Sequence, residues 1–241
     1  MGGFIDVHSH ILPDVDDGAE DIDETMQMLN IATKEGFKYI IFTPHYRCGC
    51  GKSFSKKIQE KIDLVNTKVS KQGIDLYLYI GCEIYYSEIS LKELSDKTLP
   101  TMAGSRYVLI EFHPIVDYNY IVEAVKKILL EGYYPIIAHI ERYKFITDSQ
   151  EKIENLIKLG AKIQINASSI ISRKNPPKRK IARDLLKNKL VHYVSTDAHD
   201  SVVRSPHIRN CIKFIERRYG KDYAMELLYH NPNKIINRVY D

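Results

Sequence analysis

The sequence has few cysteines, no long hydrophobic run and little excess charge, and each of these shortages excludes a class of protein. Four cysteines in 241 residues are too few for a disulfide framework, so free thiols in a reducing cytoplasm are expected. No apolar stretch approaches the ~20 residues that span a bilayer, which argues against membrane insertion. The start of the chain shows neither a secretory signal nor a myristoylation pattern, and a cytoplasmic protein is therefore expected.

The formal charge of +4 suits an anionic substrate but does not require a nucleic acid. The one strongly basic segment, residues 173–180, is interpreted as a solvated loop and helix start, so no nucleic-acid partner is expected. Its position beside the predicted site leaves open that it attracts an acidic or multiply phosphorylated tail.

Seven short, continuous apolar runs rich in valine, isoleucine and tyrosine alternate with helical patterns. Such runs are typical of buried parallel strands, and the repeated alternation favours a β/α barrel in a single domain over residues 1–241. An open sheet fits less well, because polar residues from the outer strands could not meet at one point. The predicted strands cover residues 4–7, 39–42, 76–80, 107–110, 135–138, 162–165 and 191–194. The predicted helices cover residues 21–36, 53–71, 119–131, 153–160, 181–186 and 208–215.

Six of the seven apolar runs end in a residue type that binds metal ions. His8 and His10 are alternate residues after the first run, so they share a face, and Asp197 and His199 repeat this spacing after the last. An acidic loop follows His10, and among its carboxylates Asp17 is preferred as a ligand. Polar residues at the carboxyl ends of barrel strands are typical of an active site. The candidate metal ligands are His8, His10, Asp17, His45, Glu83, Glu111, His139, Asp197 and His199.

Nine imidazole and carboxylate groups exceed the needs of one ion and suit two or three ions with bridging carboxylates. The absence of thiolates among them argues against a structural zinc site. The mixed nitrogen and oxygen set fits Mn²⁺, Fe or Zn²⁺ in a hydrolytic centre.

Arg142 follows His139 by three residues and Arg204 follows His199 by five, so both should lie at the same end of the barrel. Guanidinium groups match phosphate oxygens, and metal ions with two arginines indicate phosphoester hydrolysis. His199 or a metal-bound water is the candidate proton donor. Cys211 and Arg217 have the spacing of thiol-based tyrosine phosphatases, but the segment lacks glycine and lies on a helix face, so this alternative is rejected.

With these residues placed, the chain resembles the polymerase and histidinol phosphatase superfamily, and within it the bacterial manganese-dependent protein-tyrosine-phosphatase branch tied to capsule and exopolysaccharide synthesis. The resemblance covers nearly the whole chain. The matching segments are Asp6–Pro13, Val15–Gly18, Thr43–His45, Gly81–Glu83, Ala138–Tyr143, Thr196–His199 and Asn231–Pro232.

The resemblance implies a distorted (β/α)₇ barrel with a trinuclear, Mn²⁺-preferring centre bound by the nine candidate ligands. It also implies that Arg142 and Arg204 hold the substrate phosphate, and that the substrate is phosphotyrosine on a cognate bacterial tyrosine kinase. Two alternatives stay open: a small-molecule phosphatase of the same fold, such as a histidinol-phosphate phosphatase, and a binding module without catalysis.

The chain departs from the pattern of that branch at the rim of the predicted site. Asp14 stands where a glycine is common, and Tyr46 stands where a second histidine often follows the Thr-Pro-His motif. An unfamiliar Cys48-Gly49-Cys50-Gly51 loop comes next. These departures concern the loops and the substrate preference rather than the metal ligands.

Overall fold

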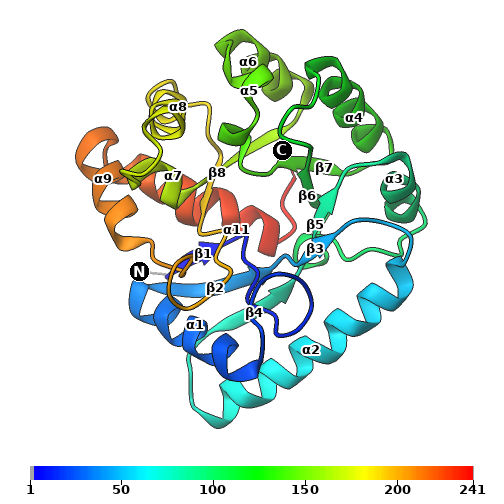
Figure 1. The fold of residues 1–241 in the computed structure, drawn as a ribbon, viewed down its shortest axis with the longest axis vertical. Coiled ribbons are helices and arrows are strands. Elements are labelled where there is room, and N and C mark those ends of the chain that lie inside the picture. Colours follow the sequence, from blue (N-terminus) through cyan, green and yellow to red (C-terminus); the bar gives the residue numbers. More distant parts are fainter. Residues whose placement is uncertain (1–2, 241) are drawn as a thin grey trace.

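A ring of parallel strands lies at the centre of the computed structural model, which describes residues 3–240 (Figure 1). All seven predicted strands are present, with boundaries shifted by no more than two residues. They are β1 (Phe4–Asp6), β2 (Phe37–Phe42), β4 (Tyr77–Ile80), β6 (Tyr107–Glu111), β7 (Tyr134–Ile137), β8 (Lys162–Asn166) and β9 (Tyr193–Ser195). Two further short strands, β3 (His45–Tyr46) and β5 (Glu83–Tyr85), follow β2 and β4 and were not predicted.

The ring closes in chain order, and its irregularities explain the distorted barrel. One sheet has the order β1-β2-β4 and the other β3-β5-β6-β7-β8-β9, with every pairing parallel. β3 follows β2 after two residues, and β5 follows β4 after two residues. Each pair acts as one interrupted strand, with its first part in one sheet and its second part in the other. Beyond β1, Ser9 bridges Ala198 after β9, and the His10 amide donates to the Ala198 carbonyl at 2.8 Å. The predicted fold class, a distorted (β/α)₇ barrel, is confirmed.

A short 3₁₀ helix, η1 (Met102–Gly104), packs against both β4 and β6 where these two strands do not pair directly. Met102 is fully buried there and belongs to the apolar interior of the barrel. The side chain therefore fills the gap that the interruption of the ring leaves.

Helices surround the ring of strands, and the six predicted helices are all present (Figure 1). The outer helices are α1 (Ile22–Glu35), α2 (Gly51–Lys71), α3 (Glu88–Ser95), α4 (Tyr118–Leu130), α6 (Gln150–Leu159), α8 (Pro176–Lys187) and α9 (Arg209–Tyr219). Short elements η2 (Ile140–Arg142), α5 (Lys144–Thr147) and α7 (Ala167–Ile171) follow β7 and β8. Across residues 3–240, no helix is both long and apolar enough to cross a membrane.

Local sequence sets the ends of α1 as predicted. The Asp21 side chain accepts hydrogen bonds from the amides of Asp23 and Glu24, which caps the first turn. Gly36 ends the helix with φ 101°, a left-handed conformation that glycine adopts without steric penalty. Among the outer helices, α3 was not predicted, because its eight residues are too few to show a clear apolar period.

Two apolar cores stabilise the barrel. The larger lies between the strands and the outer helices and contains most of the buried side chains. The smaller fills the interior of the ring, where residues such as Ile5, Leu109 and Ile136 point inward. The interior is therefore packed rather than open, which leaves the strand ends as the places where polar groups can gather.

The chain's last elements seal the amino ends of the strands. These are α10 (Lys221–Met225), η3 (Glu226–His230) and α11 (Asn231–Ile236), and Ile235 is fully buried in the interior core. Tyr134 and Tyr240 stack with ring centroids 5.4 Å apart, and the Arg106 guanidinium lies 5.0 Å and 5.3 Å from their centroids. The prediction of one domain over residues 1–241 extends to residues 1, 2 and 241, which lie outside the described part, and stays a prediction.

Candidate metal centre

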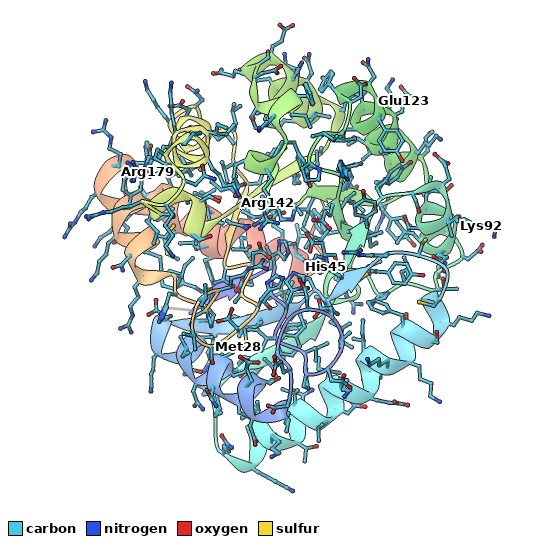
Figure 2. All side chains as sticks on the ribbon, in the orientation of Figure 1. Met28, His45, Lys92, Glu123, Arg142 and Arg179 are labelled. Carbon is cyan, nitrogen blue, oxygen red and sulfur yellow. The ribbon has the colours of Figure 1, made fainter. Side chains whose placement is uncertain are left out.

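The structure brings all nine predicted ligands together at the carboxyl ends of the strands. Figure 2 shows one of them, His45, near the middle of the ring of helices, with Arg142 close by. The nine candidate ligands come from almost every strand of the ring. His8 and His10 follow β1, Asp17 lies between β1 and α1, His45 is in β3, Glu83 begins β5, Glu111 ends β6, His139 follows β7, and Asp197 and His199 follow β9.

Glu83 lies at the centre of the cluster and is fully buried. Its Oε2 atom is 3.2 Å from Nε2 of His8, 3.3 Å from Nε2 of His10 and 3.0 Å from Nδ1 of His45. Its other oxygen, Oε1, is 2.8 Å from Nε2 of His139. One carboxylate therefore faces four imidazoles, which is the arrangement of a bridging ligand.

Asp197 divides its two oxygens between the imidazoles and the cations. Oδ1 lies 3.5 Å from Nε2 of both His8 and His10. Oδ2 is 3.1 Å from Nη2 of Arg204 and also accepts a short contact from Nη2 of Arg142. The two predicted arginines thus reach the same oxygen at the edge of the cluster.

The remaining ligands form the outer part of the cluster. Asp17 Oδ1 lies 3.5 Å from Nε2 of His45 and 3.6 Å from Nε2 of His199, and Asp17 is the most exposed of the nine. Glu111 lies on the other side, 3.7 Å from Nδ1 of His45 and 3.5 Å from Nε2 of His139. The cluster therefore runs from a buried centre to a solvent-facing edge.

The donor geometry fits several metal ions that share ligands. Four overlapping groups of three or four donors, each with all atoms within 4.8 Å of one another, together include all nine residues. Donors about 2.0–2.2 Å from one ion stand no more than about 4.4 Å apart, and the donor distances given above, from 2.8 Å to 3.7 Å, lie within this limit. Among the described residues, Glu83 Oε2 and His199 Nε2 are buried without a hydrogen-bond partner, a costly state that a bound cation relieves. Their role as metal ligands stays a prediction.

Asp16 orients two of the imidazole-bearing residues, and sequence reasoning missed it by preferring only its neighbour Asp17. Its Oδ2 atom lies 2.7 Å from Nδ1 of His10 and accepts the His45 amide at 2.8 Å. Burial raises the pKa of Asp16, but the hydrogen bond to His10 outweighs it and brings the pKa to about 2. A carboxylate that holds the far nitrogen of a ligand imidazole fixes the ring's orientation.

A buried amide chain on β8 supports the opposite side of the cluster. Gln164 Oε1 accepts the His139 amide at 2.6 Å and lies 3.3 Å from Nδ1 of His8. Gln164 Nε2 donates to Asn166 Oδ1 at 2.9 Å, and Asn166 Nδ2 donates to Asp197 Oδ2 at 2.6 Å. Sequence reasoning assigned no role to Asn166 or Gln164. The available signal was two polar residues at alternate positions of an apolar strand, which share one face.

Two of the candidate ligands have strained backbones. His139 has φ 32° and Asp197 has φ 52°, both in the left-handed region that side chains other than glycine rarely adopt. Such conformations cost about 1–3 kcal/mol each and persist where the surroundings enforce them, often at functional sites. Here they turn the chain directly after β7 and β9, so that both side chains face the cluster.

Charge in the cluster is unevenly distributed. Burial raises the pKa of Glu83 and Asp197, but nearby imidazoles outweigh it and hold both values below the usual range. Burial and then the charge of Glu83 raise the pKa of Glu111. Burial and then the charge of His10 lower the pKa of His199 to about 4, so its ring is neutral at neutral pH. A neutral imidazole is the form that binds a metal ion.

Both single-residue departures from the family pattern have structural explanations. Asp14 has φ 54°, the left-handed conformation for which glycine is the usual choice, and its carboxylate pairs with Lys61 at 3.1 Å. Tyr46 donates from its hydroxyl to Glu93 Oε2 at 2.7 Å, and Glu93 also accepts the Gly49 and Gly51 amides. This carboxylate therefore anchors the cysteine-containing loop.

The thiol alternative is excluded by burial. Cys211 is fully buried in α9, and burial raises the pKa of its thiol far above the range of a reactive thiolate. Cys48 and Cys50 are exposed on the loop before α2.

The closed barrel and the imidazole–carboxylate cluster at its carboxyl end define the class, a metal-dependent hydrolase of the β/α-barrel type. The family model for capsular polysaccharide synthesis proteins CpsB/CapC matches residues 4–237. The chain belongs to this family, which confirms the resemblance drawn from the sequence.

Named relatives agree over nearly the whole chain. The tyrosine-protein phosphatase CpsB of Streptococcus pneumoniae is 36% identical over 238 residues, covering 97% of this chain and 98% of the relative. The tyrosine-protein phosphatase YwqE of Bacillus subtilis is 31% identical over 220 residues, covering 91% and 86%. A crystal structure from work on these two proteins, described as unique metal-dependent tyrosine phosphatases, superposes with a TM-score of 0.87 at 29% identity and covers 97% of this chain and 94% of the other.

Proposed function

We propose that this protein is a metal-dependent tyrosine phosphatase that hydrolyses phosphotyrosine on a cognate bacterial tyrosine kinase controlling capsule or exopolysaccharide synthesis. The observation that carries the proposal is the convergence of nine imidazole and carboxylate groups with two arginines on one strand edge. Family membership and the names of the relatives support the phosphotyrosine substrate and the capsule context.

The donor set supports Mn²⁺ as the metal, and its nine residues would be enough to hold three ions. Imidazole and carboxylate donors without thiolate suit Mn²⁺, and the same set accepts Fe or Zn²⁺. The ligands in this proposal are His8, His10, Asp17, His45, Glu83, Glu111, His139, Asp197 and His199. Bound ions would polarise the phosphoryl oxygens and lower the pKa of a bound water, so that hydroxide forms near neutral pH.

Arg142 and Arg204 hold the phosphoryl group in this proposal. In the structure both guanidinium groups meet at Asp197 Oδ2, which places them at the edge of the cluster, on the side of Asp197 away from the imidazoles. Guanidinium forks fixed in this position neutralise charge on the phosphoryl oxygens as it develops. The tyrosine leaving group has a pKa near ~10 and needs little help to depart. The neutral ring of His199 suits a ligand, and it would need to take up a proton before it could donate one.

The deciding experiment compares two substrates after exhaustive chelation and readdition of Mn²⁺. We expect turnover of a phosphotyrosine peptide to disappear on chelation and to return with Mn²⁺, and histidinol phosphate to react far more slowly. Turnover of histidinol phosphate alone would move the protein to small-molecule metabolism. Inactivity on both substrates would favour the binding module without catalysis.

A pair of arginine variants tests the placement of the phosphate. Arg204→Ala should lower kcat/KM for the peptide by about 10²–10³-fold, because a charged donor to the transition state is lost. Arg217→Ala is the matched control, since Arg217 is exposed on α9 and belongs to the rejected thiol motif. Equal losses in the two variants would contradict the assignment of Arg204.

A further inference from the structure

Lys178 lies at the start of α8, beside the candidate centre but outside its nine ligands. The Asn175 side chain caps this helix by accepting the Lys178 amide at 3.1 Å, which fixes the backbone of the first turn. α8 packs against η2, the short helix that carries Arg142. Figure 2 shows Arg142 near the centre of the ring of helices and Arg179, the residue after Lys178, on α8 at its edge.

Two guanidinium groups and two carboxylates surround the Lys178 side chain. Its half-buried ammonium group is repelled by Arg142 and Arg204 and attracted by Glu141 and Asp197. Burial, followed by the charge of Arg142, lowers the pKa of Lys178. Yet within residues 3–240 the ammonium forms no ion pair and no side-chain hydrogen bond.

Neither of the two nearby carboxylates pairs with the Lys178 ammonium. Glu141 Oε1 accepts from the Asn166 amide at 3.1 Å and from the Ser169 hydroxyl at 2.6 Å, and Glu141 Oε2 is buried without a hydrogen-bond partner. Asp197 Oδ2 is shared by Arg142 and Arg204. A half-buried cation beside two guanidinium groups is unfavourable without an anion, so this part of the site is prepared to receive one.

We propose that Lys178 is a third cationic group that positions the phosphoryl group of the substrate, beside Arg142 and Arg204. The proposal rests on the proposed function and deepens it. A phosphate ester carries two negative charges and three peripheral oxygens, so it can accept from three cations at once. The assignment singles out one residue of the basic segment 173–180. Arg179 is engaged with the Ser172 carbonyl at 3.2 Å, and Lys180 is exposed and lies on the far side of the helix from Lys178.

The test measures binding of inorganic phosphate to the Mn²⁺-loaded protein by calorimetry, which needs no turnover. Lys178→Gln should weaken phosphate binding about tenfold, because a charge-assisted hydrogen bond is lost. Lys178→Arg should keep binding within about threefold, since the charge remains. Lys180→Gln removes the same charge from the same helix and should change binding less than twofold.

Kinetics on a phosphotyrosine peptide supply the second readout. Lys178→Gln should raise KM and the inhibition constant for phosphate together, about tenfold, and change kcat by less than threefold. A merely structural role would instead lower the metal content and kcat. Unchanged phosphate binding in Lys178→Gln, or no phosphate binding by the wild-type protein, would overturn the proposal. So would a loss confined to peptides with acidic flanking residues. A wild-type protein that binds phosphate but ignores phosphotyrosine would refute the proposed function alone and leave the assignment of Lys178 standing.

Discussion

The two ends of the barrel are built from the same strands but differ in chemistry. At the amino ends, Ile235 and a stack of Tyr134, Tyr240 and Arg106 close the ring with apolar and aromatic contacts. At the carboxyl ends, Glu83 and the imidazoles around it form a buried polar cluster, in which Glu83 Oε2 and His199 Nε2 have no hydrogen-bond partner. Burial at the first end contributes stability, whereas burial at the second makes the site functional. Substitutions at the two ends should therefore separate activity from folding.

The largest expected effect is a loss of activity on substitution at the carboxyl end. Glu83→Gln removes the negative charge from the centre of the imidazoles and should lower kcat by about 10³-fold or more, with loss of bound metal. Initial rates and elemental analysis measure the two effects. Glu123→Gln, on an exposed residue of α4 that pairs with Lys126, is the control and should leave both unchanged. A Glu83→Gln protein with full metal content and rate would refute the central role of this carboxylate.

At the amino end, a substitution is expected to lower stability and to leave activity unchanged. Ile235→Ala leaves a cavity in a fully buried position and should lower the free energy of unfolding by about 3 kcal/mol. Urea unfolding measures this change, while kcat of the folded protein should stay within twofold of wild type. Leu130→Ala truncates a side chain that is 85% exposed and should have almost no effect on stability. A large fall in kcat for Ile235→Ala would show that the two ends are coupled.

The smallest expected effect is on the pH dependence of stability, and it involves His192, a histidine outside the candidate metal centre. His192 precedes β9, and its Nδ1 atom accepts the Ile163 amide at 3.1 Å. Burial, with the charges of Lys162 and Lys234, lowers the pKa of His192 from 6.5 to about 4. The unfolded chain therefore takes up the proton first, and the stability that the neutral ring contributes above pH 6.5 is lost as the pH falls toward 4.

The size of this loss is about 2 kcal/mol, since the ring is partly exposed. His192→Asn keeps an acceptor near the position of Nδ1 but cannot titrate. The difference in unfolding free energy between wild type and variant, measured by urea unfolding of metal-free protein at several pH values, should shrink between pH 7 and 4. A difference that does not change with pH would contradict the assignment.

The sequence predicted the ring of strands well because each buried strand is a continuous apolar run. It did not predict β3 and β5, because their few residues are mixed polar and apolar and are strands only by pairing with each other and with β6. The C-terminal seal was also missed. Its helices are short, and the π-helical segment η3 interrupts the regular helical period.

In the site, residue types could be predicted, but orientations could not. All nine candidate ligands converge because parallel strands bring their carboxyl ends to one edge. Asp16 contacts His10, whereas its neighbour Asp17 contacts His45. The direction of these two side chains follows from the turn at Asp14, whose left-handed conformation could not be predicted from the aspartate itself. The role of Gln164 depends on contacts with His8 and His139, which are distant in sequence.

The bridge between Ser9 and Ala198 has a consequence for how the protein is made. His8 and His10 leave the ribosome before Asp197 and His199, yet the four must meet. Because synthesis proceeds at about 5–20 residues per second, the early histidines wait about 10–40 seconds for their partners. The complete cluster cannot form before Asp197 and His199 have emerged, so we infer that the full set of ions would bind only as the ring closes.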